Sequence, residues 1–189
     1  MSAPTFELTF PHTWQVEILP ERPVILPARH FVYPREVEEI ERGALEVLVR
    51  PDDPGSSPFL ATCALGFRDP VVPTGIWSAP NPREICAISG GYAYIVDTAA
   101  PENFTMLPYR PVLQVQPVVD RDLLLFVGNR SIVAWGVNGE AWETVKLSDE
   151  GVAITAIEGA VLRGRGWNMM TDKETPFALN LKSGVLLTK

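Results

Sequence analysis

The sequence is poor in the side chains that build metal sites and nucleophilic sites. Its 189 residues include two cysteines and two histidines. A disulfide framework needs more cysteines, and Cys63 and Cys86 lack the CxxC spacing of a metal or redox motif. Both cysteines have apolar neighbours along the chain. We therefore predict that they are free, buried thiols that act as small apolar side chains.

Long apolar runs and clusters of basic residues are also missing. No run approaches the roughly 18 apolar residues of a membrane-spanning helix, and no signal peptide is visible at the N-terminus. The formal net charge is −7, and the longest basic feature is Arg163-Gly164-Arg165. Because phosphate-rich partners require clustered cations, we expect no nucleic-acid partner and no membrane partner. We expect a soluble, cytoplasmic protein.

Motifs of catalysis and cofactor binding are absent from the sequence as well. There is no GxSxG nucleophile turn, no GxGxxG dinucleotide fingerprint and no GxxxxGK[ST] phosphate loop. Gly164-Arg165-Gly166 belongs to a predicted hairpin, whereas a dinucleotide site needs a strand-to-helix turn. We therefore predict no cofactor, and the enzyme hypothesis is the weaker one.

The proline content differs between the two parts of the chain. Of its 18 prolines, only Pro176 lies beyond Pro117. Proline has no backbone N–H to donate to a sheet, so its density favours strand edges and ends. We expect a single domain, in which residues 1–84 form an irregular, proline-rich part and residues 85–189 form regular hairpins.

Glycine turns between apolar segments are the strongest structural signal. Gly90-Gly91, Asn138-Gly139 and Glu158-Gly159 each separate two such segments, as two-residue hairpin turns do. In the first half, alternation predicts a strand over 14–18, and Val24–Leu26 predicts a brief strand. A proline at the start, acidic residues next and a glycine at the end predict one short helix over 34–43.

These elements predict an all-β fold, an antiparallel β-sandwich or rolled sheet of short hairpins with one short helix. An alternative is a partial repeat like the blades of a β-propeller. It is suggested by apolar strands that end at Gly90, Gly128 and Gly159. The chain is too short to close a propeller of ordinary blade number, so the sandwich or rolled sheet is favoured.

Three carboxylates are candidates for catalysis. Asp97, Glu140 and Glu143 lie on predicted strands, and a converging carboxylate pair can hydrolyse glycosides. Acidic residues that alternate with apolar ones usually form the solvent face of a sheet, which is the competing interpretation. A small hydrolase or carbohydrate-processing domain is therefore the alternative function.

A second candidate site lies in residues 163–177, which we predict to be a long loop. Trp167, Met169 and Met170 are unusual in a simple connection and are favoured in interfaces, so we predict that they bind a ligand or partner. The competing interpretation is that the loop packs back over one end of the sheet. His12 and His30 are an alternative site as metal ligands, although no motif spacing joins them.

The resulting hypothesis is a non-catalytic cytoplasmic binding or protein-interaction module. The partner is an unknown protein or small molecule. The proline-rich N-terminal part is a candidate for contact with a second copy of the chain, which makes a homo-oligomer one of the expected possibilities. The absence of catalytic motifs and the number of strand-connecting loops favour this hypothesis.

Overall fold

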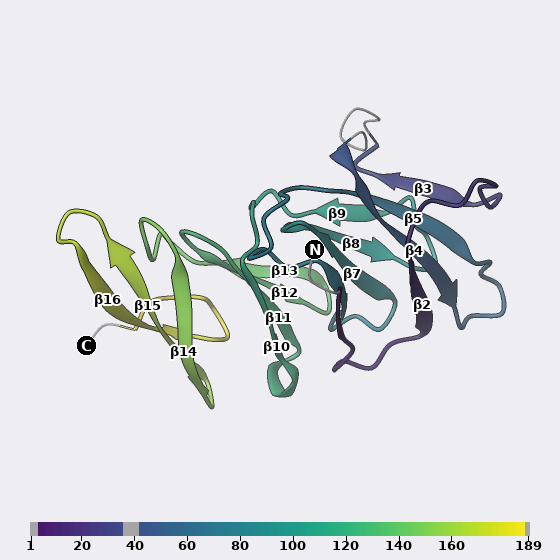
Figure 1. Cartoon of the computed structure of the whole chain (residues 1–189). Coiled ribbons are helices and arrows are strands. Elements are labelled where there is room, and N and C mark those ends of the chain that lie inside the picture. The colour runs from purple at the N-terminus through teal and green to yellow at the C-terminus, as the bar shows by residue number, and fades with distance from the viewer. Residues whose placement is uncertain (1–3, 36–41, 188–189) are drawn as a thin grey trace. The chain divides into compact units, whose positions relative to one another are not determined.

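The computed structural model describes residues 4–35 and 42–187, and its regular structure is almost entirely β (Figure 1). The predicted all-β class is confirmed. The helix expected over 34–43 falls largely on residues 36–41, which lie outside the described residues. Within the described ranges, no helix combines the length and the apolarity that crossing a membrane requires.

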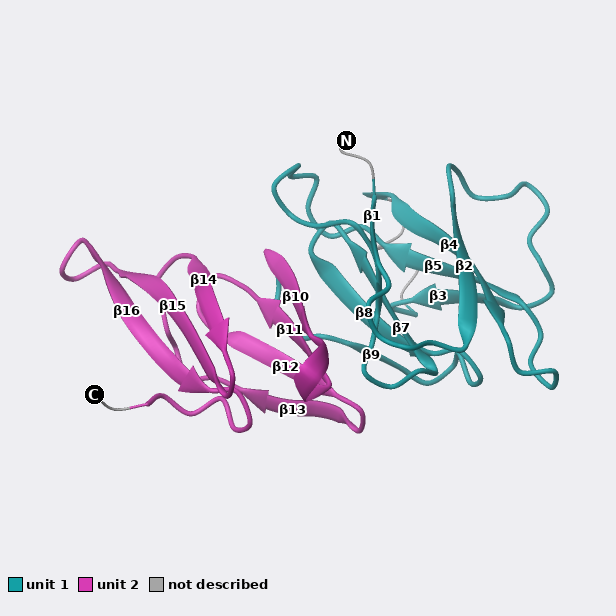
Figure 2. Cartoon of the chain, turned by 90° about the horizontal axis from the view of Figure 1, so that it is seen from below, with its two compact units in different colours: residues 1–111 teal, residues 112–189 magenta. Residues whose placement is uncertain are grey.

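The chain divides into two compact units, Met1–Pro111 and Val112–Lys189 (Figure 2). The predicted boundary between the irregular part, residues 1–84, and the hairpin part, residues 85–189, falls inside unit 1, at the start of β7 (Glu84–Ser89). Each unit contains two sheets and its own apolar core, so each is described separately.

Unit 1 is a β-sandwich. One sheet has the order β1-β6-β7-β8-β9 and the other the order β2-β4-β5-β3. The bounds of the strands not yet given are β1 (Thr5–Glu7), β2 (Trp14–Leu19), β3 (His30–Tyr33), β4 (Ala44–Pro51), β5 (Phe59–Ala64), β6 (Gly75–Ser78), β8 (Tyr92–Asp97) and β9 (Phe104–Met106). Trp14, Val47 and Phe59 of one sheet share a buried core with Ile85 and Tyr94 of the other. This shared core is what makes the two sheets a sandwich.

Turn residues account for the regular hairpin of unit 1. Gly90 and Gly91 have φ values of 55° and 75°, which residues with a side chain rarely adopt. They connect β7 to β8 as predicted. Two pairings differ from a purely antiparallel arrangement, because β1 pairs parallel with β6 and β3 pairs parallel with β5.

The brief strand predicted over Val24–Leu26 is wrong. These residues lie in the connection between β2 and β3 and are exposed. Pro23 and Pro27, on either side, lack backbone N–H donors, and within the described residues Val24, Ile25 and Leu26 form no backbone hydrogen bond.

Unit 2 also consists of two sheets, here two antiparallel meanders, with the orders β10-β11-β12-β13 and β14-β15-β16. Their bounds are β10 (Gln114–Val118), β11 (Leu123–Val127), β12 (Ile132–Gly136), β13 (Gly139–Glu143), β14 (Val152–Glu158), β15 (Val161–Asn168) and β16 (Lys173–Asn180). The turns at Gly139 and Gly159 have φ values of 104° and 58°, as the predicted hairpins require. Leu125 and Trp142 of the first sheet share a buried core with Leu162 and Leu179 of the second.

The long loop predicted over 163–177 is wrong. β15 continues to Asn168, β16 begins at Lys173, and the two pair up to the turn. The inner face of β15 carries glycine at 164 and 166, because the ring of Phe177 covers Gly164 and the backbone of Leu147 covers Gly166. The alternation of apolar side chains that identifies a strand is therefore missing from this one.

Candidate functional site

Within residues 4–35 and 42–187, the strand β3 forms one edge of its sheet and is paired on one side only, with β5. The carbonyl of Arg29, just before β3, accepts a hydrogen bond of 3.0 Å from the N–H of Leu60 in β5. Backbone groups of successive strand residues point to opposite sides. The N–H and C=O groups of Phe31 and Tyr33 therefore point toward β5, whereas those of His30 and Val32 point toward the free edge.

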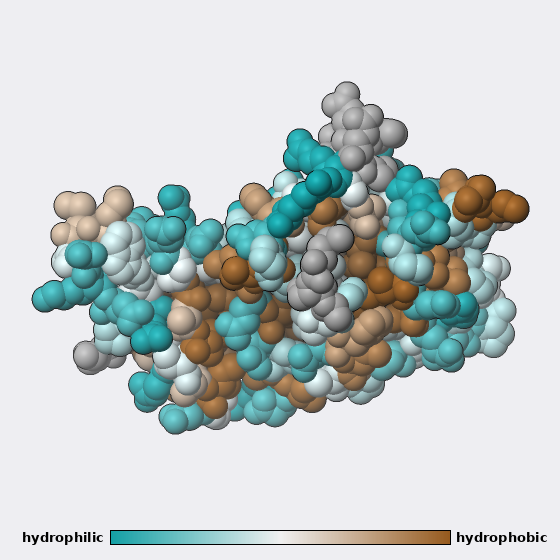
Figure 3. All heavy atoms as spheres, viewed as in Figure 1, coloured by the Kyte–Doolittle hydropathy of each residue, from teal (hydrophilic) through white to brown (hydrophobic). Residues whose placement is uncertain are grey.

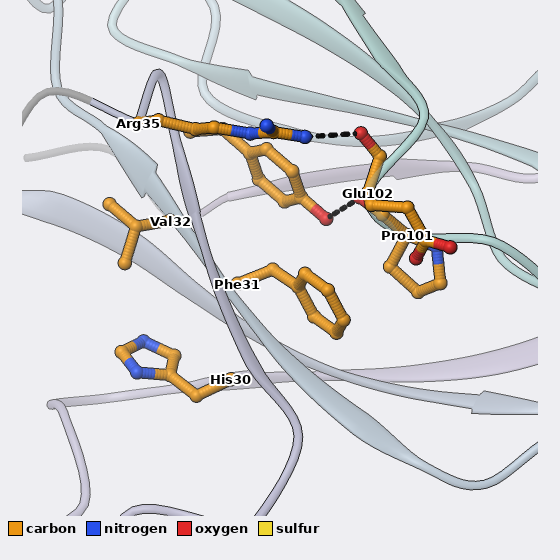
Figure 4. Close-up of a pocket in the computed structure, with 7 residues that line it drawn as sticks. His30, Phe31, Val32, Arg35, Pro101 and Glu102 are labelled. Atoms are coloured by element: carbon orange, nitrogen blue, oxygen red, sulfur yellow. Dashed lines mark hydrogen bonds between the residues drawn. The ribbon is translucent and has the colours of Figure 1, made fainter.

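An open pocket of about 300 Å³ lies along this free edge. Its lining consists of the whole of β3, the residue two positions after it and two residues of the β8–β9 connection, namely His30, Phe31, Val32, Tyr33, Arg35, Pro101 and Glu102. The side chains of His30 and Val32 lie on the opposite side of the strand from the ring of Phe31, which lies toward Pro101 (Figure 4). His30 and Val32 thus line the pocket with their backbone.

Two hydrogen bonds hold the far wall of the pocket in place. The Tyr33 hydroxyl donates to the carbonyl of Pro101 at 2.7 Å, and the Arg35 guanidinium donates to the carbonyl of Glu102 at 2.8 Å. Burial raises the pKa of Tyr33 far above its usual value, so the hydroxyl remains a neutral donor. The guanidinium of Arg35 also lies over the ring of Phe104, 5.9 Å from its centre. These contacts connect β3 and Arg35 to the β8–β9 connection and to β9, and the lining includes apolar groups at Phe31 and Pro101.

A chain of polar side chains lies behind this edge. Arg22 Nε donates to Glu46 Oε1 at 2.8 Å, and the Thr62 hydroxyl donates to Glu46 Oε2 at 2.5 Å. His30 Nε2 lies 2.8 Å from the Thr62 hydroxyl oxygen. Glu46 is 5% exposed and Thr62 is fully buried. We name these four residues the polar chain.

The polar chain fixes the state of His30. A hydroxyl has one proton, and here the carboxylate accepts it, so His30 Nε2 must carry the hydrogen that points at Thr62. Burial lowers the pKa of His30, partly offset by the Glu46 carboxylate, and Arg22 lowers it further. The imidazole is therefore held neutral and in one orientation. The polar chain therefore positions β3. Because solvent does not reach the Thr62 hydroxyl, the polar chain supplies no accessible nucleophile.

Sequence reasoning named His30 but missed the rest of the pocket and the polar chain. The four residues of the polar chain come from β4, β5, the start of β3 and the connection before β3. Their spacing along the chain has no regular pattern. The one signal in the sequence is the pair of polar residues, Glu46 and Thr62, inside otherwise apolar strands.

The two histidines have separate environments. His12 Nδ1 lies 3.0 Å from the carbonyl oxygen of Phe10, and its ring packs 4.5 Å from the ring of Trp14. Across residues 4–35 and 42–187, no three His, Cys, Asp or Glu side chains are close enough together to hold a metal ion. Metal binding by His12 and His30 stays a prediction.

The three candidate carboxylates are divided between the units. Asp97, at the end of β8 in unit 1, accepts two hydrogen bonds of 2.8 and 3.1 Å from Arg83. Glu140 and Glu143 lie on β13 in unit 2, where both are exposed. The Ser131 hydroxyl donates to Glu143 at 3.0 Å. None of the three lines the pocket at β3, and the hydrolase alternative stays a prediction.

Trp167, Met169 and Met170 lie at the hairpin that connects β15 to β16. Trp167 is half-buried, and its backbone N–H donates to the Ser148 hydroxyl at 2.9 Å. Met169 and Met170 are 63% and 89% exposed, so they do not pack back over the sheet. Partner binding by these residues stays a prediction.

The cysteines are free and buried as predicted. Burial raises the pKa of both thiols well above the usual value, which keeps them protonated and unreactive. They serve as packing residues.

No family model, curated protein or solved structure matches this chain. Its function must therefore be inferred from its own residues and geometry.

Proposed function

We propose that this protein is a protein-interaction module that binds an extended segment of a partner polypeptide along the free edge of β3. One observation carries the proposal: the pocket is lined by four consecutive residues of a strand that is paired on one side. The N–H and C=O groups of His30 and Val32 are the donors and acceptors that an added strand requires. An extended peptide is the one common partner that supplies matching groups at the same spacing.

The composition of β3 supports the proposal. Proteins protect the edges of their sheets with charges, prolines, bulges or very short strands, because an open edge invites further pairing. The other edges of both units have such protection: Glu7 on β1, Glu17 on β2, only three residues in β9, Pro117 on β10, Glu140 and Glu143 on β13, a bulge in β14, and Lys173, Glu174 and Pro176 on β16. The residues of β3 are His30-Phe31-Val32-Tyr33, without a formal charge when the imidazole is neutral. This edge is open in composition as well as in pairing.

The pocket supplies selectivity for a side chain. Alternate side chains of an added strand point to opposite faces of the sheet. Those on the inner face would reach the space between Phe31 and Pro101, which suits an apolar or aromatic group. The exposed carboxylate of Glu102 lies at the rim, where a basic residue of the peptide is favoured.

The test is a proline at Val32. Val32→Pro removes an N–H that points away from β5, and proline is tolerated at such a position of an edge strand. Val32→Ala is the matched control, because it shortens the same side chain and keeps the N–H. The probe is a set of heptapeptides selected against the wild-type chain from a random library displayed on phage.

We expect Val32→Pro to weaken binding of these heptapeptides at least about tenfold, and Val32→Ala to weaken it much less, since one main-chain hydrogen bond and strand geometry are lost only in the first. Circular dichroism checks that both variants keep the wild-type fold. Equal binding by the wild type and a folded Val32→Pro variant would rule out strand addition at β3.

A further inference from the structure

An exposed apolar segment stands just before β3. Val24 and Ile25 are 103% and 87% exposed, and Leu26 is 45% exposed. We name these three residues the apolar tip. In Figure 3 the connection between β2 and β3, at the right of the view, ends in a strongly hydrophobic protrusion. Three adjacent large apolar side chains in water are costly, at about 25 cal/mol for each Å² of apolar surface.

The structure holds the apolar tip firmly. Pro23 and Pro27 restrict the backbone on either side of it. Beyond them, Arg22 is paired with the buried carboxylate of Glu46, and the Arg29 guanidinium donates to the carbonyl of Ser57 at 2.5 Å. Arg29 also lies over the rings of Phe31 and Phe59, 5.7 and 5.8 Å from their centres. A segment held this way loses little conformational entropy when it binds.

The backbone of the apolar tip is available for pairing. Within the described part of the chain, Val24, Ile25 and Leu26 form no backbone hydrogen bond. The tip thus offers apolar side chains together with free N–H and C=O groups in a proline-flanked, restrained segment. These are the features that the edge of β3 and its pocket require of a partner.

We infer that the apolar tip of one copy lies along β3 of a second copy, an inference that rests on the proposed function and names its partner. Each copy then has one donor segment, residues 24–26, and one acceptor edge, residues 30–33. The contact is heterologous, because different surfaces of the two copies meet. Assembly can therefore continue beyond a dimer, into a closed ring or an open filament, and the average mass rises with protein concentration.

Net charge sets the conditions for this assembly. Each copy has a formal charge of −7, so copies repel each other at low salt. Salt screens this repulsion, while apolar burial and main-chain hydrogen bonds are less sensitive to it. Association is expected to strengthen as sodium chloride is added.

Complementation between two variants tests the inference. The donor variant Val24→Ser/Ile25→Ser lacks the apolar tip, and the acceptor variant Val32→Pro lacks the free edge. Val71→Ser is the matched control, since Val71 is another apolar residue of unit 1 with 76% exposure. Light scattering after size exclusion gives the masses. A synthetic peptide of residues 21–29 serves as a competitor that does not depend on the folding of any variant.

The wild type and the control are expected to gain mass with concentration, whereas each tip or edge variant alone keeps the single-chain mass of 20.8 kDa. A mixture of the two variants is expected to form a one-to-one dimer, because one intact tip and one intact edge remain. The peptide is expected to dissociate the wild-type assembly.

A wild-type mass of one chain at every concentration and salt, or a mixture that fails to dimerise, overturns this inference. If the selected heptapeptides still require the β3 edge in that case, the proposed function stands and the partner is a different protein. If neither the heptapeptides nor a second copy requires the edge, both proposals fail.

Discussion

The polar chain offers the sharpest test of how β3 is held in place. Thr62→Val keeps the shape of a fully buried side chain and removes the hydroxyl that joins Glu46 to His30. One oxygen of the buried carboxylate then loses its partner, and so does Nε2 of the imidazole. An unsatisfied buried polar group costs about 1–3 kcal/mol, and the other oxygen of the Glu46 carboxylate keeps its hydrogen bond from Arg22.

We estimate about 2 kcal/mol for the carboxylate and about 1 kcal/mol for the partly buried imidazole, so Thr62→Val lowers the free energy of unfolding by about 3 kcal/mol. Thr62→Ser is the control. It keeps the hydroxyl and loses one buried methyl group, which costs about 1 kcal/mol. The two variants should therefore differ by about 2 kcal/mol.

Urea unfolding followed by tryptophan fluorescence measures this difference, because Trp14 is buried in the core of unit 1. A double-mutant cycle with Glu46→Gln identifies the source of the loss. Once Gln replaces the buried charge, Thr62→Val should cost roughly 1 kcal/mol. The reasoning is refuted if Thr62→Val and Thr62→Ser unfold within about 0.5 kcal/mol of each other.

The remaining predictions concern the pH dependence of stability and two glycine turns. Since burial lowers the pKa of His30, the unfolded chain binds this proton more readily, and stability falls as the pH drops through the usual histidine value of about 6.5. In urea titrations between neutral and mildly acidic pH, His30→Asn should flatten that loss, whereas an unchanged slope would contradict it. Gly90 and Gly159 have similar φ values of 55° and 58°, but a side chain at Gly90 would collide with the carbonyl of Phe67, and one at Gly159 meets nothing within 4 Å. Thermal melting should show that Gly90→Ala costs at least about 1 kcal/mol more than Gly159→Ala, and equal costs would show that the backbone at Phe67 moves aside.

Local sequence signals predicted the regular half of the fold. A hairpin needs a turn with positive φ and two alternating segments that are neighbours along the chain. Gly90-Gly91, Asn138-Gly139 and Gly159 supply the turns, and the hairpins lie at those positions. The same signals underestimated the length of the next hairpin, because β15 continues from the predicted strand after Gly159 to Asn168 and β16 begins at Lys173, within residues expected to form a loop.

Contacts between segments that are far apart in the sequence could not be predicted from the sequence. The parallel pair of β3 and β5 joins residues that are 30 apart in the sequence, and no turn signal marks such a pair. The pocket adds Pro101 and Glu102, which reach β3 only through the packing of the sandwich. His30 was singled out as an isolated histidine. Its role depends on Thr62 and Glu46, which the sequence places on separate strands.

The exposed glutamates of β13 have a physical role as charges on an edge strand. Glu140 and Glu143 were considered as catalytic groups, yet both lie on a strand that ends its sheet. Charges there discourage a further strand, because pairing would remove water from them. β9 is also an uncharged edge, but it has three residues and none of them lines the pocket. Length, composition and a pocket coincide at β3, so this edge, rather than β9 or β13, is the place where a partner strand is expected.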